Sequence, residues 1–172
     1  MRLRAAGIAE NSWGWHSEKM KREILFCIAA GMLLACCVSV AAQELGYWRA
    51  SSKTAHSITG DIAISDTEIS MDFSNFAIVR ARDLEPAEVS SVFDTDSSAS
   101  TKAHLYGLSI PGSKRFMHKN TLCGGEEARW MVTYVDGRSL QLAIFSGSKA
   151  PVFTPDAISN STDLCGTYSY VR

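Results

Sequence analysis

Hydrophobic and polar residues alternate most clearly between Arg129 and Phe145. Two segments, RWMVTYV and RSLQLAIF, flank the dipeptide Asp136-Gly137, which is a strong signal for a tight β-hairpin turn. A two-residue turn at Asp136-Gly137 pairs Val135 with Arg138 and Thr133 with Leu140. Both faces of this hairpin carry apolar side chains, so we expect it to be central in a sheet or covered on its second side.

A second hairpin is predicted over residues 61–73. Alternating residues before and after a turn at 65–67 place one set of apolar side chains on a single face, namely Ile62, Ile64, Ile69, Met71 and Phe73. Further strands are expected at 76–80, at 105–110, where Pro111-Gly112 ends the strand, and at 167–171.

One short helix is predicted after Asp83, which we expect to cap it. Pro86 falls in the first turn, and Glu85 and Glu88 lie where the helix dipole favours acidic residues. Eight or so short strands and one helix predict a mainly β fold, a compact antiparallel barrel or sandwich between which the pattern does not choose. Its core is expected to include Trp130, Tyr134, Phe145, Phe116, Leu140 and Ile144.

The longest apolar run precedes this region and predicts export. Residues 24–42 contain no charge, follow Lys19, Lys21 and Arg22, and end in Val40-Ala41-Ala42. A basic start, an apolar middle and small residues at the end are typical of a secretory signal peptide, so we predict cleavage after Ala42 and a periplasmic or secreted product. The alternative is an uncleaved transmembrane helix, which at ~1.5 Å per residue would span about 28 Å.

Two further hypotheses concern this leader. Residues 1–19 are long and mixed in charge for a leading basic region, so translation from Met20 is a second hypothesis for the start. The segment Leu33-Leu34-Ala35-Cys36 loosely resembles a bacterial lipobox, which would place a lipid on Cys36; otherwise the leader cysteines are small apolar residues.

Composition leaves one globular domain, residues 43–172, after this N-terminal extension. The chain has 172 residues and a net charge of -1; residues 1–42 hold five of its 17 basic and three of its 18 acidic residues, so residues 43–172 carry -3. A mildly acidic surface lacks the basic signature of a nucleic-acid-binding protein, and no such partner is expected.

Cys123 and Cys165 are the cysteines that remain after cleavage. Two cysteines in a protein that folds in an oxidising compartment predict a disulfide between them. It would close a loop of about 43 residues and contribute ~4 kcal/mol on the chain-entropy estimate. Neither cysteine belongs to a CxxC motif, so a redox or metal role is not expected.

Catalytic and cofactor motifs are missing from residues 43–172. The sequence has no GxSxG or HExxH motif and no phosphate-binding loop. His56, His104 and His118 are far apart, so surface or hydrogen-bonded histidines are expected in place of a metal site. We therefore predict no cofactor and no metal, and we expect a non-enzymatic protein, with a hydrolase as the alternative.

An exposed loop is the candidate for partner binding. Ser146, Gly147, Ser148 and Lys149 follow the best strand and lead into a long connection. This segment resembles the Ser-Gly loop with which the periplasmic lysozyme inhibitors of the MliC type, small exported β-domains with a disulfide, enter the lysozyme cleft. It departs from that family at the following aromatic residue.

The function expected from the sequence is that of an exported, non-enzymatic module that binds an envelope or extracellular protein. The alternatives are a lysozyme-inhibitor-like protein, an envelope hydrolase and a secreted factor that acts on a host cell. A hydrolase should show titrating groups that converge in a cleft, and a binding module an exposed apolar or aromatic patch. An open apolar lumen would favour a lipid or small-ligand carrier.

Overall fold

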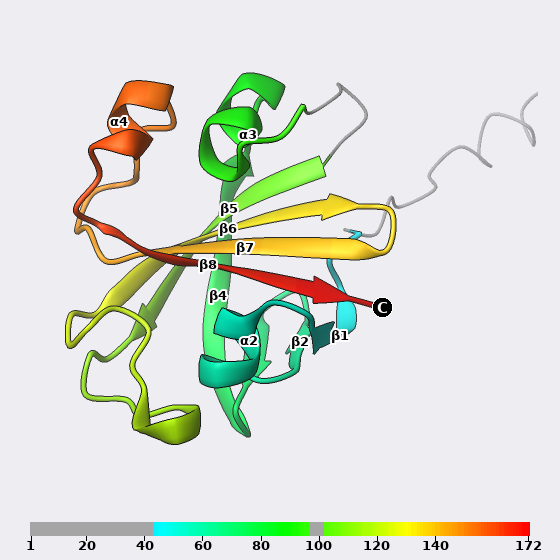
Figure 1. Cartoon of the computed structure of the whole chain (residues 1–172), viewed down its shortest axis with the longest axis vertical. Coiled ribbons are helices and arrows are strands. Elements are labelled where there is room, and N and C mark those ends of the chain that lie inside the picture. Colours follow the sequence, from blue (N-terminus) through cyan, green and yellow to red (C-terminus); the bar gives the residue numbers. More distant parts are fainter. Residues whose placement is uncertain (1–42, 97–101) are drawn as a thin grey trace, which may run out of the picture. The chain divides into compact units, whose positions relative to one another are not determined.

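Eight antiparallel strands follow one another around a closed barrel in the computed structural model of the chain (Figure 1). The structure describes residues 43–96 and 102–172. Of the two alternatives, the barrel is therefore the fold, and the prediction of a mainly β chain is confirmed. The strands are β1 (Gly46–Ala50), β2 (Ile62–Ile64), β3 (Glu68–Met71), β4 (Ser74–Asp83), β5 (Lys102–Ile110), β6 (Ala128–Asp136), β7 (Ser139–Phe145) and β8 (Leu164–Val171).

Closure depends on a short contact between the first and last strands. Arg49 pairs with Val171 and Ala50 with Tyr170. All strand pairs and both hydrophobic clusters of the described residues lie within 45–171. This part of the chain therefore closes its own core, consistent with its separation as one compact unit, Ala41–Arg172.

Short helices fill the connections. They are α2 (Lys53–Ile58), α3 (Pro86–Phe93), the 3-10 turn η2 (Met117–Lys119) and α4 (Pro155–Ser159). Only α3 was expected; α2 and α4 have six and five residues, too few to show a helical hydrophobic period. The Ser52 and Thr154 side chains cap α2 and α4 by accepting hydrogen bonds from main-chain amides.

The predicted cap of α3 is wrong. Glu85 is the N-cap residue, and the Glu88 side chain accepts a 3.0 Å hydrogen bond from the Glu85 amide, as in a capping box. Asp83 is instead the last residue of β4, where its carboxylate pairs with Arg80 at 2.6 Å.

The 129–145 hairpin forms, but its register differs from the prediction by two residues. Asp136 pairs with Ser139 and Val135 with Leu140, so the turn is Gly137-Arg138. Gly137 has φ +57° at the first turn position, which is the glycine placement of a type II′ turn. A shift of two residues keeps every side chain on its predicted face, because the side-chain period of a strand is two.

The 61–73 hairpin also forms, with one correction at its end. Ile62, Ile64, Ile69 and Met71 are buried as predicted, whereas Phe73 has a relative exposure of 107%. Strand β3 ends at Met71, and Asp72 and Phe73 form the two-residue turn to β4, both with positive φ (46° and 58°). The alternation stops at the turn, so Phe73 does not reach the buried face.

Two hydrophobic clusters explain why the β6–β7 hairpin is apolar on both faces. One cluster fills the barrel interior with large side chains that are fully buried, such as Trp48, Tyr168, Tyr170, Met131 and Leu140. The other lies on the outer face of β5–β7, beneath α3 and the segment that contains α4 (Figure 1), and includes Tyr134, Phe145, Phe153 and Val89. The lumen is thus packed with side chains, which removes the argument for a carrier with an open lumen.

Several predictions about the leader lie outside the described residues. They are the signal peptide, cleavage after Ala42, the start at Met20 and a lipid at Cys36. Within residues 43–96 and 102–172, no helix has the length and hydropathy needed to cross a membrane.

Candidate functional site

A buried polar cluster lies inside the barrel, where Glu44 meets strand β5. The Tyr106 hydroxyl donates a 2.6 Å hydrogen bond to Glu44 Oε1, and His104 Nδ1 contacts the same oxygen. Relative exposures are 1% for Glu44, 2% for His104 and 3% for Tyr106. The groups needed for acid–base chemistry therefore converge, but they have almost no contact with solvent.

Hydrogen bonding keeps Glu44 in its charged form. Burial opposes ionisation, but hydrogen bonds from His104, Tyr106 and the main chain outweigh it, and the pKa of Glu44 is lowered. Burial and the neighbouring carboxylate raise the pKa of Tyr106. Among the described residues, Glu44 Oε2 and Thr133 Oγ1 are buried without a hydrogen-bond partner, and Thr133 is paired with His104 across β5 and β6.

The same cluster fixes the entry of the chain into the barrel. The Glu44 carbonyl accepts a 2.7 Å hydrogen bond from the Trp48 indole. The Arg172 guanidinium donates to the carbonyls of Gln43 (2.9 Å) and Leu45 (3.2 Å) and lies 4.3 Å from the centre of the Trp48 ring. These contacts join the two ends of the domain, which indicates a structural role for the cluster.

An open pocket of about 530 Å³ lies on the outside of the barrel, over strands β1–β3 and beside α2 and η2. This volume is in the range of small-molecule and side-chain binding sites. Ala63 on the outer face of β2 and Met117 from η2 contribute its apolar lining, with the exposed ring of Tyr47 (59%) at its border. Ile62 and Met71 also border the pocket, although their side chains are buried in the barrel interior.

A hydrogen-bonded pair provides the fixed polar group of this pocket. The Tyr47 hydroxyl donates to Asp61 Oδ2, and Asp61 Oδ1 accepts a 2.8 Å hydrogen bond from the Ala50 amide. The bond from Tyr47, followed by the bond from Ala50, lowers the pKa of Asp61. The same bond to Asp61 raises the pKa of Tyr47. His56 and Asp72 also line the pocket and are available for polar contacts with a ligand.

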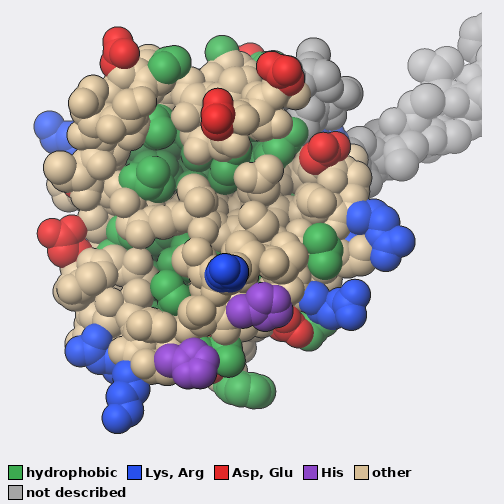
Figure 2. All heavy atoms as spheres, in the orientation of Figure 1, with side chains coloured by type: hydrophobic (Ala, Val, Ile, Leu, Met, Phe, Trp, Pro, Cys, Tyr) green, Lys and Arg blue, Asp and Glu red, His purple; other side chains and the backbone are tan. Residues whose placement is uncertain are grey.

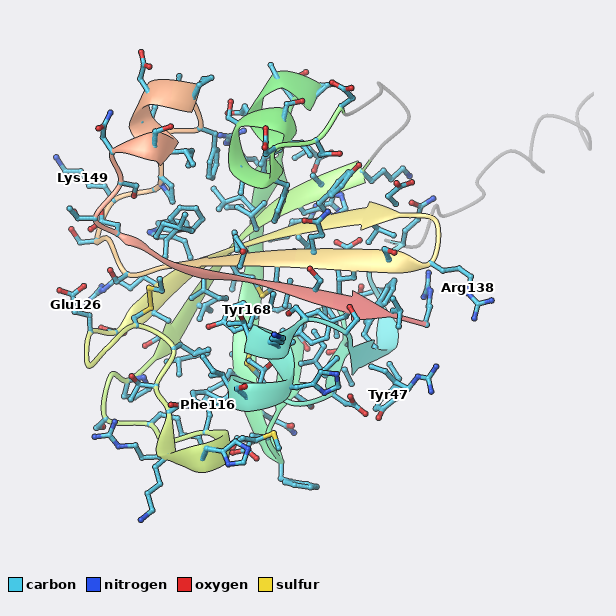
Figure 3. The ribbon with its side chains drawn as sticks, in the orientation of Figure 1. Tyr47, Phe116, Glu126, Arg138, Lys149 and Tyr168 are labelled. Atoms are coloured by element: carbon cyan, nitrogen blue, oxygen red, sulfur yellow. A yellow bond between two sulfur atoms is a disulfide. The ribbon has the colours of Figure 1, made fainter. Side chains whose placement is uncertain are left out.

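The predicted binding loop lies elsewhere on the barrel. The Ser146 amide donates a 2.9 Å hydrogen bond to the Asp163 carbonyl, and the Gly147 carbonyl accepts a 3.0 Å hydrogen bond from the Trp130 indole. Only Ser148 and Lys149 of the four residues are exposed. Figure 3 shows Lys149 and Tyr47 on opposite sides of the molecule, so this loop and the pocket are separate surfaces.

The predicted disulfide is confirmed. Cys123 and Cys165 are bonded, with a Cα–Cα distance of 4.8 Å. The bond ties the β5–β6 connection, which contains η2, to the start of β8. It therefore holds this connection against the barrel.

The three histidines of residues 43–172 differ in their surroundings. His104 is buried and hydrogen-bonded, while His56 and His118 are exposed. In the described ranges, no group of three His, Cys, Asp or Glu side chains is arranged to hold a metal ion.

Sequence reasoning missed both the interior cluster and the pocket. For the cluster a signal exists, since His104 and Tyr106 are two residues apart in a strand and so must share a face. For the pocket no local signal exists, because its lining comes from four separate segments. Comparison with known proteins finds no match to a family model, a curated protein or a solved structure.

Proposed function

We propose that this protein is an exported, non-enzymatic binding module and that the pocket over β1–β3 receives its partner. The observation that carries the proposal is an open pocket of about 530 Å³ with an apolar lining and the anchored carboxylate of Asp61 at its border. A few fixed polar groups in an apolar concavity are typical of specific binding sites.

A protein partner in the envelope or outside the cell fits this site best. An apolar side chain of the partner would fill the space above Ala63 and beside Met117, and Asp61 and His56 would contact its polar groups. The Cys123–Cys165 disulfide supports a periplasmic or secreted location, because such bonds persist in oxidising compartments.

The hydrolase alternative receives less support. Glu44, His104 and Tyr106 converge, but they are buried inside the barrel, away from any substrate. In the open pocket, the Asp61 carboxylate already accepts hydrogen bonds from Tyr47 and Ala50. The lysozyme-inhibitor-like alternative depends on the exposed Ser148 and Lys149 and needs a separate test.

Blocking the pocket tests the proposal. Ala63 is on the outer face of β2 in the pocket, and Ala77 is on the outer face of β4 away from it. We expect residues 43–172 to capture a protein from an envelope or culture extract, Ala63→Trp to lose it and the matched Ala77→Trp to retain it, with capture quantified by mass spectrometry.

The results of the capture experiment distinguish the pocket from the Ser146–Lys149 loop as the binding site. Capture that Ala63→Trp does not weaken would contradict the pocket as the binding site, and recovery of no partner would contradict a binding module. Loss of the same partner in Lys149→Glu alone would assign binding to the Ser146–Lys149 loop. Loss of the partner on reduction would show that binding needs the disulfide-held fold.

A further inference from the structure

An apolar side chain projects from one end of the barrel. Phe73 is at the tip of the β3–β4 hairpin with a relative exposure of 107%, at the edge of the pocket. Its ring packs in neither hydrophobic cluster of the described residues. Folding thus leaves a large apolar ring exposed to water. Transfer of this ring into an apolar medium would be favourable.

Backbone strain is concentrated at the same end. Asp72 and Phe73 have φ of 46° and 58°, and His118 and Lys119 in η2 have φ of 55° and 65°. A positive φ is costly for residues other than glycine, and observed strain of this kind often marks a functional surface. The Lys114 ammonium donates a 2.7 Å hydrogen bond to Ser74, next to Phe73. Met117 of η2 lines the same pocket as Phe73, so η2 and the hairpin tip are neighbours.

This end of the barrel is also basic. Residues 111–125 contain Lys114, Arg115, His118 and Lys119 and no acidic residue. None of these four side chains takes part in an ion pair within the described part of the chain. The Lys114 ammonium lies 5.6 Å from the centre of the Phe116 ring. The nearby Asp61 and Asp72 line the pocket, and Asp61 is already hydrogen-bonded by Tyr47 and Ala50. We call Phe73, Lys114, Arg115, His118 and Lys119 the basal surface.

Charge is segregated on the face of the barrel that Figure 2 shows. Figure 2 shows acidic side chains mainly over the helical upper part of this face, and histidines and basic side chains in its lower part. Helix α3 and its flanks carry Glu85, Glu88, Asp94 and Asp96. Although residues 43–172 have a net negative charge, a protein with this distribution turns its basic end toward an anionic surface.

We propose that the basal surface docks onto an anionic lipid bilayer. Phe73 enters the interface between headgroups and acyl chains, and Lys114, Arg115 and Lys119 lie beside the lipid phosphates. A projecting ring next to a connection rich in basic residues fits a deformable surface, as in interfacial membrane anchors. One aromatic side chain and three cations predict weak, reversible binding that salt opposes.

Vesicle binding by residues 43–172, which lack the apolar leader, tests the proposal. We expect cosedimentation with phosphatidylcholine–phosphatidylglycerol vesicles at low ionic strength, little with pure phosphatidylcholine, and loss in salt. Phe73→Gly, which suits the positive φ, should weaken binding about tenfold, and Lys119→Asn about fivefold.

Matched variants on other surfaces provide the controls. Val152→Ala removes an exposed apolar side chain and Lys149→Asn an exposed cation, both outside the basal surface; both should bind vesicles like the unmodified protein. Ala63→Trp should also bind vesicles, which separates this inference from the pocket.

Three results would overturn the inference. They are equal binding to anionic and neutral vesicles, anionic binding that both Phe73→Gly and Lys119→Asn retain in full, and binding to neither kind of vesicle. In the last case, capture of an acidic protein through Phe73 would assign the basal surface to a protein partner instead.

Discussion

The Tyr106 hydroxyl donates a 2.6 Å hydrogen bond to Glu44 Oε1 across 62 residues of sequence. Glu44 precedes the first strand, and Tyr106 lies on β5, which is not adjacent to that strand in the barrel. The bond therefore fixes the start of the domain across the barrel interior. Its disruption should affect the whole fold, because both groups are buried.

We expect Glu44→Ala to lower the free energy of unfolding by about 3 kcal/mol, because it leaves polar groups of His104 and Tyr106 buried without a partner. Urea denaturation followed by circular dichroism measures this change. Glu68→Ala, at an exposed position on β3, is the control and should change stability by less than about 0.5 kcal/mol. Equal effects of the two variants would contradict a stabilising role for the cluster.

The same carboxylate predicts a specific pH dependence. The pKa of Glu44 in the folded protein lies below its ordinary value of 4.5. Its contribution to stability is therefore full above that ordinary value and is lost as the pH falls through the lower, folded value. The difference in unfolding free energy between the unmodified protein and Glu44→Gln should be largest at neutral pH and shrink as the pH falls below 4.5.

The lowered pKa values of Asp61, Asp83 and Glu88 act in the same direction. They are present in both proteins and cancel in the comparison, apart from the coupling between Asp83 and Glu44. A difference that stays constant with pH would exclude Glu44 as a source of the acid sensitivity.

The strands were predictable because their signal is local. The closure of the barrel was not, because it depends on residues that are distant in the sequence. The period of two in residues 61–71 and 129–145 places each side chain on its face, even where the register differs by two residues. The barrel closes through Arg49–Val171 and Ala50–Tyr170, pairs that are too distant in sequence for any periodicity to report. Barrel and sandwich therefore give the same pattern along the chain.

The candidate site was harder to predict for a related reason. Glu44 follows a long apolar run and precedes Gly46, so it has the appearance of a solvated linker residue. Its burial depends on a partner 60 residues away, His104. Likewise, Phe73 continues the alternation of β3, and only the sharp turn at Asp72 places it outside the core.

Loss of the disulfide should destabilise the barrel by about 4 kcal/mol, because the Cys123–Cys165 bond closes a loop with a sequence separation of 42. Thermal denaturation with and without a reductant measures the effect. A variant with both Cys123→Ser and Cys165→Ser should have the lower stability and be insensitive to the reductant. Free thiols at both positions in the native protein would contradict the prediction.

Two substitutions with opposite effects test the backbone strain at the turns. Phe73→Gly should raise the free energy of unfolding by about 0.5–1 kcal/mol, because the exposed ring contributes no packing and Asp-Gly is a preferred type I′ turn. Gly137→Ala, at φ +57°, should lower it by about 1 kcal/mol, because alanine is strained where glycine is not. Denaturant titrations of both variants give the comparison. A loss of stability in Phe73→Gly would mean that the ring supports the fold. The hairpin tip would then have a structural role instead of a binding role.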